Sequence, residues 1–93
     1  MAKVIWSELA LDDLKSIHDY ISKDSMIYAN RVIEKIIQRI DQLESFPKSG
    51  RVVPELNNNS IRELIQNNYR IIYKVTTQEI FIVSIHHASK LME

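Results

Sequence analysis

Two adjacent histidines, His86 and His87, follow an apolar run in "IFIVSIHHAS". Imidazole binds metal ions and exchanges protons near neutral pH, so the pair is a candidate for a metal site or for general acid–base catalysis. A metal site needs a third and usually a fourth ligand, and the sequence holds no cysteine to supply one. Adjacent residues of a strand also point to opposite faces. We therefore expect no metal site, and the remaining alternatives are a catalytic role for one histidine or a structural role for both.

The size and composition predict a single domain, residues 1–93, without a membrane segment. A chain of 93 residues supports one domain, and 45% hydrophobic residues are enough to form a core. The opening "MAKVIWSELALDD" has no signal-type apolar segment, and no run approaches the ~18 apolar residues of a membrane span. We therefore expect a cytoplasmic protein, and nothing in the sequence points to a cofactor.

The charge distribution weakens a direct role in nucleic-acid binding without excluding one. The formal net charge is zero, from 12 Lys/Arg and 12 Asp/Glu. Residues 1–46 hold six basic and eight acidic side chains, and residues 47–93 hold six and four. This asymmetry is far smaller than the basic surface with which proteins usually bind nucleic-acid phosphates.

The first half of the sequence predicts two helices. Ser7 is a candidate N-cap after the β-prone "KVIW". Apolar residues then recur at helical spacing: Ala10, Leu14, Ile17 and Ile21. Asp24 or Ser25 is a candidate cap for a second helix, whose apolar stripe extends from Ala29 to Leu43. Because the link between them is short, the two helices are expected to form an antiparallel hairpin.

The second half of the sequence predicts three strands. After Gly50, the apolar period changes to two in "SIRELI", "NYRIIYKV" and "EIFIVSI", and the connections "QNN" and "TTQ" are short enough for hairpins. The element order is therefore β-α-α-β-β-β. We expect an α+β fold, in which an antiparallel sheet carries the N-terminal helical hairpin on one face.

Alternation along "YRIIYKV" predicts which side chains face away from the helices. It divides the strand into two sets, with Tyr69, Ile71, Tyr73 and Val75 on one side and Arg70, Ile72 and Lys74 on the other. The second side is expected to be open to water or to a partner, with Arg70 and Lys74 exposed on it. On the neighbouring strand, Arg62 is a candidate ion-pair partner of Glu63 or Glu55.

These motifs in this order resemble the RelE/ParE superfamily of bacterial toxins from type II toxin–antitoxin systems. In the first half the resemblance is carried by Trp6, Ala10, Asp13, Leu14, Ile17, Tyr20 and Ile21, and in the second by "FPKSGRVVPEL", "IREL", "YRIIYKV" and "IVSIHH". It implies a cognate antitoxin, whose C-terminal segment wraps the toxin and whose N-terminal domain binds operator DNA. Operator DNA would then be reached only through the antitoxin.

The superfamily has a branch that poisons DNA gyrase and a branch that cuts mRNA on ribosomes. The gyrase-directed, ParE-like branch shares the "SGR…PEL…IREL…YRI.Y.V" run, and its last strand typically ends in "VLH" followed by small residues. The segment "SIHHAS" fits that ending, with His86 at the strand-end histidine. The resemblance therefore favours a plasmid-stabilisation toxin of the ParE-like branch, which is not an enzyme.

The alternative is a RelE-like, metal-independent endoribonuclease. Such cleavage needs a base for the 2′-hydroxyl, a cation for the phosphorane and an acid for the leaving oxygen. Resemblance to this branch places Arg70 at the cation, and Glu55 is the candidate base. The tail "HHASKLME" lacks the usual arginine and tyrosine, which leaves His86, His87 and Lys90 as substitutes.

A third alternative is an inactive toxin that only binds its antitoxin. In either non-catalytic case, four of the six basic side chains of the second half are candidates for binding the antitoxin or the target. They are Arg51, Arg62, Arg70 and Lys74. Arginine is suited to this role because its planar guanidinium group pairs with a carboxylate through two parallel hydrogen bonds.

Overall fold

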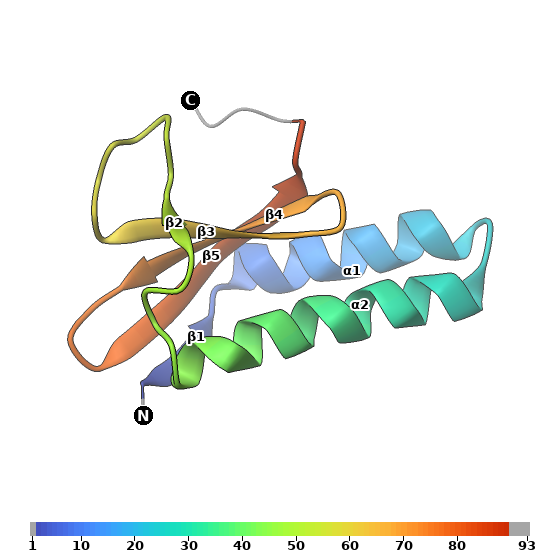
Figure 1. The fold of residues 1–93 in the computed structure, drawn as a ribbon. Helices are drawn as coiled ribbons and strands as arrows, with labels where there is room; N and C mark the ends of the chain where they lie inside the picture. Colours follow the sequence, from blue (N-terminus) through green and yellow to red (C-terminus); the bar gives the residue numbers. More distant parts are fainter. Residues whose placement is uncertain (1, 90–93) are drawn as a thin grey trace.

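The computed structural model describes residues 2–89, which form two α-helices, a 3₁₀ helix and five strands. The elements in chain order are β1 (Lys3–Trp6), α1 (Glu8–Ser22), α2 (Met26–Asp41), η1 (Gln42–Glu44), β2 (Arg51–Val52), β3 (Ile61–Gln66), β4 (Tyr69–Val75) and β5 (Glu79–His87). Figure 1 shows the two helices side by side, as a hairpin that lies along one side of the sheet. The predicted α+β fold with its helical hairpin is confirmed, and the short strand β2 is an addition to it.

The sheet is mixed, with the strand order β1-β5-β4-β3-β2. The neighbours β2/β3, β3/β4 and β4/β5 are antiparallel as expected, whereas β1 runs parallel to β5, with Lys3 opposite Glu79 and Trp6 opposite Ile82. The expectation of antiparallel pairing is therefore wrong for this one pair. Strands joined by a tight turn must be antiparallel, but the helical hairpin and three strands separate β1 from β5 along the chain.

Both helices begin at a serine cap. The Ser7 hydroxyl accepts a hydrogen bond from the Ala10 N–H at 2.9 Å, and the Ser25 hydroxyl accepts one from the Tyr28 N–H at 3.1 Å. Each cap satisfies an amide group that has no partner within its own helix. The prediction of Ser7 is confirmed, and Ser25 rather than Asp24 caps the second helix.

The core lies between the hairpin and the sheet. Helix α2 buries Ala29, Val32, Ile36 and Ile40, and η1 buries Leu43. The sheet contributes Leu64, Ile71, Tyr73, Ile80, Ile82 and Ile85. The predicted apolar stripe of the second helix is thus confirmed except at Ile37, which is 37% exposed. Because apolar residues recur every three or four positions in the helix and every two in the strands, each element has one continuous apolar side.

Two side chains at the start of α1 attach this helix to an irregularity in β5. The register between β4 and β5 shifts at Val83, and the Val83 carbonyl accepts a hydrogen bond from the Ser7 hydroxyl at 2.9 Å. The Asp13 carboxylate accepts one from the Ile85 N–H, also at 2.9 Å. Ser7, the N-cap of α1, and Asp13 within α1 thus bind main-chain groups of β5 at the bulge and two residues beyond it.

Gly50 stands where a side chain would not fit. Its N–H donates to the Tyr73 hydroxyl at 2.9 Å. A Cβ atom at this position would lie 2.5 Å from that hydroxyl and 2.5 Å from the Glu63 carbonyl oxygen, well inside van der Waals contact. The segment that leads into β2 can therefore lie this close to β3 and β4 only with glycine at position 50.

Candidate functional site

Arg70 is buried, although it lies on the face of the sheet opposite the helices. It is 4% exposed, so the prediction that it is open to water is wrong. The cover comes from residues 53–60, between β2 and β3, which we name the Glu55 loop (Figure 1). In this loop Val53 is fully buried, and Glu55 reaches the Arg70 side chain. Strand alternation gave the correct face, but an irregular loop determines the burial on it.

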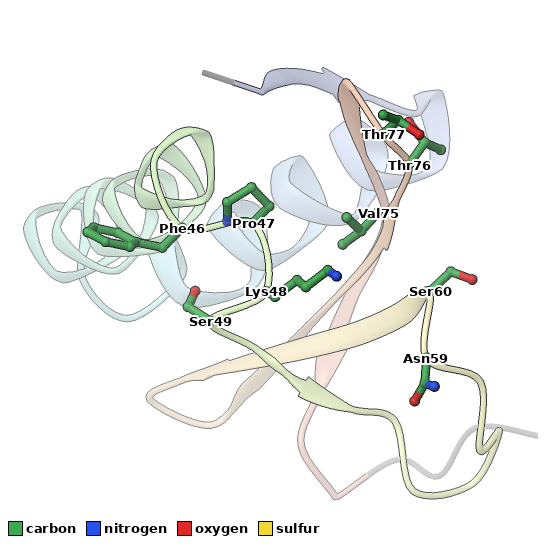
Figure 2. A pocket seen from close by; sticks show the side chains of 9 residues that line it. All are labelled: Phe46, Pro47, Lys48, Ser49, Asn59, Ser60, Val75, Thr76 and Thr77. Carbon is green, nitrogen blue, oxygen red and sulfur yellow. The ribbon is translucent and has the colours of Figure 1, made fainter.

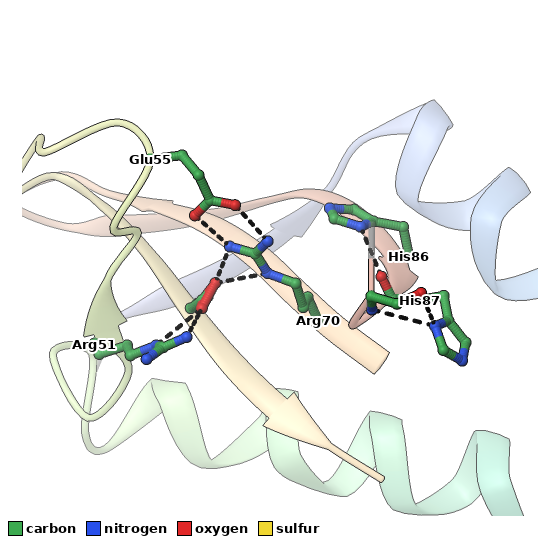
Figure 3. Close-up of polar contacts among 7 residues, drawn as sticks. Arg51, Glu55, Arg70, His86 and His87 are labelled. Carbon is green, nitrogen blue, oxygen red and sulfur yellow. Dashed lines mark hydrogen bonds and ion pairs between the residues drawn. The ribbon is translucent and has the colours of Figure 1, made fainter. Parts of the chain in front are cut away.

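Four charged side chains form one row on this face, in the order Arg51, Glu63, Arg70 and Glu55, which we name the charge cluster (Figure 3). The Arg70 guanidinium group donates to both oxygens of Glu55, from Nη1 to Oε2 at 2.7 Å and from Nη2 to Oε1 at 2.9 Å. Its Nε donates to Oε1 of Glu63 at 2.8 Å, and its Nη2 contacts the same oxygen. Arg51 reaches Oε2 of Glu63 with Nε and Nη2, both at 2.9 Å.

The charge cluster is buried in its middle and open at its ends. The side chains of Glu63 and Arg70 are 0% and 5% exposed, whereas those of Glu55 and Arg51 are 20% and 64% exposed. The hydrogen bonds with Glu55 raise the pKa of the Arg70 guanidinium above its usual value, and those with Glu63 act in the same direction against the lowering effect of burial. The two cations and two anions of the cluster give it a net charge of zero. Such pairing is expected where charges such as those of Glu63 and Arg70 are buried.

The chemistry of this arrangement is that of a filled arginine fork. A guanidinium group offers parallel N–H donors whose geometry suits a planar carboxylate or a phosphate. Here the Nη1 and Nη2 pair of Arg70 is taken up by the carboxylate of Glu55. The structure therefore brings together three of the predicted site residues, Arg51, Glu55 and Arg70, as partners in an ion-pair network.

Arg62 and Lys74 lie apart from the charge cluster. Arg62 donates from Nη1 to the Gly50 carbonyl at 2.9 Å, and its other hydrogen bonds also go to main-chain carbonyls. The ion pair considered for it with Glu63 is not formed, since the oxygens of Glu63 pair with Arg51 and Arg70. Lys74 is exposed near the far end of β4, as predicted.

The two histidines occupy different surroundings. His86 lies opposite Arg70 in the ladder, and its Nε2 is buried with no hydrogen-bond partner among residues 2–89. His87 is exposed, lies 2.7 Å from the Ser89 hydroxyl through Nδ1, and meets the Tyr69 ring edge-on at 5.9 Å. Consecutive positions of β5 direct them to opposite sides of the sheet, as predicted. Lys90, the third candidate of this segment, lies outside the described residues.

One groove on the molecule holds none of the predicted site residues (Figure 2). It has a volume of about 1010 Å³ and lies between the segment after η1 and the β4–β5 turn. The side chains that line it are Phe46, Pro47, Lys48, Ser49, Asn59, Ser60, Val75, Thr76 and Thr77. This surface is separate from the charge cluster, because no residue is common to the two.

Metal-binding and membrane-spanning elements are both absent from residues 2–89. No three His, Cys, Asp or Glu side chains in this part of the chain are grouped so that they could hold a metal ion. Neither helix there combines the length and the apolar composition needed to cross a bilayer. The charge cluster is the main candidate site of residues 2–89 because it joins three of the predicted site residues.

Glu63 is the site residue that sequence reasoning missed as a member of the cluster. The sequence indicates it only as a partner for Arg62, yet its carboxylate joins Arg51 to Arg70. The available signal was the ladder register, which places Glu63 on the same face as Arg70 when "IRELI" pairs with "YRIIY". That register depends on the turn between the strands, and the residue types alone did not determine it.

A family model and a curated relative both match almost the whole chain. A family model described as "ParE toxin of type II toxin-antitoxin system, parDE" matches residues 4–92. The chain therefore belongs to the ParE toxin family. A curated relative, "Toxin RelE2" of Caulobacter vibrioides (strain ATCC 19089 / CIP 103742 / CB 15), is 37% identical over 92 residues, which cover 98% of this chain and 100% of the relative. The family assignment confirms the predicted resemblance to RelE/ParE toxins.

Solved structures of other toxins share the fold of this ParE family member. The chain matches one titled "Chromosomal ParDE TA system from P. aeruginosa" with a TM-score of 0.77 and 22% identity, covering 94% of this chain and 96% of the other. It matches the YoeB dimer from Staphylococcus aureus with a TM-score of 0.63 and 16% identity, covering 92% and 95%. At these identities the two matches establish the α+β fold alone.

Proposed function

We propose that this type II toxin acts on a protein target, DNA gyrase, and that a cognate antitoxin neutralises it. The observation that carries the proposal is the filled fork of Arg70. A ribonuclease of this kind needs a cation that takes up the charge developing on the phosphorane. Arg70, which the resemblance to RelE-like toxins places at this cation, has a side chain that is only 5% exposed. It pairs with two carboxylates, those of Glu55 and Glu63.

The electrostatics of the charge cluster support a protein target. A phosphate approaching Arg70 would meet the carboxylates of Glu55 and Glu63 within hydrogen-bond distance of the same guanidinium group. These like charges oppose the approach of a phosphodiester. The chain as a whole also has zero formal net charge, which provides little long-range attraction for RNA.

Exposed apolar side chains at the far end of the helical hairpin support a protein partner. Tyr20, Met26, Ile27 and Tyr28 are each more than half exposed, and they surround the turn between α1 and α2. Large apolar side chains gathered on one surface are typical of protein–protein contacts. Two of the similar structures are complexes of YoeB with the antitoxin YefM, which supports an antitoxin as one such partner.

The second candidate function is ribosome-dependent mRNA cleavage. It is favoured by the placement of three side chains on one face of the sheet: the carboxylate of Glu55, the guanidinium of Arg70 and the imidazole of His86. These are the group types that a base, a phosphate-binding cation and an acid would require. For this activity the Glu55–Arg70 pair would have to separate, so that one group accepts a proton while the other contacts phosphate.

The experiment that separates the two candidates is pulse labelling after induction in a bacterial host. We expect thymidine incorporation to fall first, and the purified chain to inhibit DNA supercoiling by gyrase. A collapse of methionine incorporation within minutes, with thymidine incorporation maintained, would refute the gyrase proposal. Glu55→Gln is the informative variant, because loss of a general base would lower the cleavage rate on the order of 10²–10⁴-fold. A gyrase inhibitor should keep its effect on thymidine incorporation in this variant.

A further inference from the structure

We propose that the position occupied by the Glu55 carboxylate is an exchangeable carboxylate-binding site, in which an acidic side chain of the antitoxin replaces Glu55 on the fork of Arg70. This inference rests on the proposed antitoxin partner and assigns a function to the Glu55 loop. In the free toxin Glu55 fills the fork from within the chain. In the complex a carboxylate of the partner polypeptide takes the same two donors, Nη1 and Nη2.

The two carboxylates on Arg70 differ in how firmly the fold holds them. Glu63 belongs to β3, is paired with β2 on one side and β4 on the other, and has a side chain that is 0% exposed. Glu55 belongs to a loop outside the strands, and its side chain is 20% exposed. Displacing Glu63 would require the sheet to open, whereas Glu55 can leave the fork while the strands stay paired. Glu55 is therefore the exchangeable partner.

Hydrogen bonds hold the Glu55 loop on both sides of Glu55. At one end the Val53 N–H donates to the Ile61 carbonyl at 3.2 Å. At the other end the Asn58 side chain accepts from the Ser60 N–H at 2.9 Å. Between these points the Leu56 and Asn57 N–H groups donate to the Val53 carbonyl at 3.2 and 3.1 Å, so the backbone of this turn is also held. The Glu55 carboxylate would therefore leave the fork by rotation of its own side chain. Movement of the Glu55 carboxylate is therefore compatible with an intact sheet.

Among the members of the charge cluster, the charges that remain when Glu55 leaves favour one class of ligand. Arg51, Glu63 and Arg70 together carry a net charge of +1, which one carboxylate neutralises. A phosphate dianion would bring an excess of negative charge beside the buried carboxylate of Glu63. Exchange of one carboxylate for another leaves no buried charge unpaired, so the large penalty for an isolated buried ion is avoided. The site thus favours an aspartate or glutamate side chain over the phosphate of a nucleic acid.

The first test is chemical rescue of a toxin that lacks the Glu55 carboxylate. Glu55→Ala should unfold at a lower temperature than the wild type. Sodium acetate, at about ten times the Kd of acetate for the vacated site, should raise the Tm of this variant by roughly 5–10 °C relative to sodium chloride at equal ionic strength. The wild type should show no such acetate effect, since its own carboxylate fills the fork. Glu34→Ala removes an exposed carboxylate of α2 and serves as the matched control, with no rescue expected. Glu55→Ala combined with Arg70→Lys should also lose rescue, because lysine lacks the fork.

Two results of this test would overturn the proposal. Rescue by inorganic phosphate without rescue by acetate would show that the fork takes phosphate, and would favour an RNA ligand. Equal stability of Glu55→Ala in acetate, phosphate and chloride would show that no exchangeable anion site exists at Arg70. Both readouts are made on the isolated toxin, so they hold whether or not gyrase is its target.

The second test measures exchange in the complex with the co-expressed antitoxin. Glu55→Gln removes the internal competitor while keeping the shape of the side chain, so the affinity for the antitoxin should increase roughly 10–100-fold, the worth of a hydrogen bond to a charged group. Arg70→Lys should weaken it. An unchanged or lower affinity of Glu55→Gln would overturn the exchange, and this measurement decides the matter if Glu55→Ala does not fold.

Discussion

Replacing Glu63 by glutamine tests whether the buried half of the charge cluster stabilises the fold. The carboxylate of Glu63 accepts from Arg51 on one oxygen and from Arg70 on the other, and its side chain is 0% exposed. A glutamine keeps one acceptor but turns its NH₂ group toward the donors of one of the two arginines. Breaking a buried ion pair from one side typically costs about 3–5 kcal/mol. Because Glu55 continues to pair with Arg70, we expect a loss of about 2–4 kcal/mol in the free energy of unfolding.

The assay is equilibrium unfolding in urea, followed by far-UV circular dichroism, together with a thermal scan. For a domain of this size the expected loss corresponds to a decrease in Tm of roughly 10–20 °C. Arg51→Gln is the matched control, since it removes the other end of the same interaction at a side chain that is 64% exposed. Its cost should be smaller, about 1–2 kcal/mol, because Glu63 loses the partner of one oxygen but keeps its hydrogen bonds with Arg70. If Glu63→Gln costs no more than Arg51→Gln, the reasoning about the buried pair is refuted.

Three further predictions concern the packing around the sheet. Gly50→Ala should lower the free energy of unfolding by about 1–3 kcal/mol in urea titrations, because its Cβ would collide with the Tyr73 hydroxyl. Ser49→Ala, the control at the neighbouring position, should leave the free energy of unfolding unchanged. Equal values for the two variants would contradict the close approach at Gly50. Asp13→Ala should lower the free energy of unfolding by about 1–2 kcal/mol in the same assay, because the Ile85 N–H loses its acceptor. A loss below about 0.3 kcal/mol would contradict the proposed contribution of this α1–β5 hydrogen bond to stability. Burial raises the pKa of the Tyr73 hydroxyl, so its contribution to stability is present below the unfolded-state pKa of about 10 and is lost as the pH rises through the folded value. The alkaline decline in Tm should therefore be shallower in Tyr73→Phe, and an identical decline would contradict this.

The sequence was most informative where a repeating pattern or a cap chemistry acts locally. Ser7 and the stripe from Ala29 to Leu43 could be predicted because helical spacing and N-cap preferences involve neighbours along the chain. The helix-facing side of β4 followed from alternation for the same reason. The parallel pairing of β1 with β5 could not be predicted in this way, because no turn connects the two strands.

The candidate site was harder to predict because its burial depends on an irregular segment. Alternation placed Arg70 on the face away from the helices, and a face without helices was expected to be exposed. The sequence of the Glu55 loop has no repeating apolar pattern from which its position over the sheet could be predicted. Once it folds back, Arg70 changes from an exposed cation to a buried one with carboxylates on both sides. Residue types therefore predicted three of the four members, Arg51, Glu55 and Arg70. The tertiary structure added Glu63 and showed that Arg70 is buried.

The pairing of β1 with β5 also determines when this toxin can fold during its synthesis. The Ser7 hydroxyl and the Val83 carbonyl are separated by 76 residues along the chain, and the Asp13–Ile85 hydrogen bond spans 72. Contacts of such high sequence separation form slowly, because a long loop must close before they contribute. Since β5 lies between β1 and β4, the sheet stays divided until β5 has left the ribosome. The nascent toxin thus cannot complete its sheet, or the charge cluster's neighbour at His86, before residues 79–87 have been synthesised.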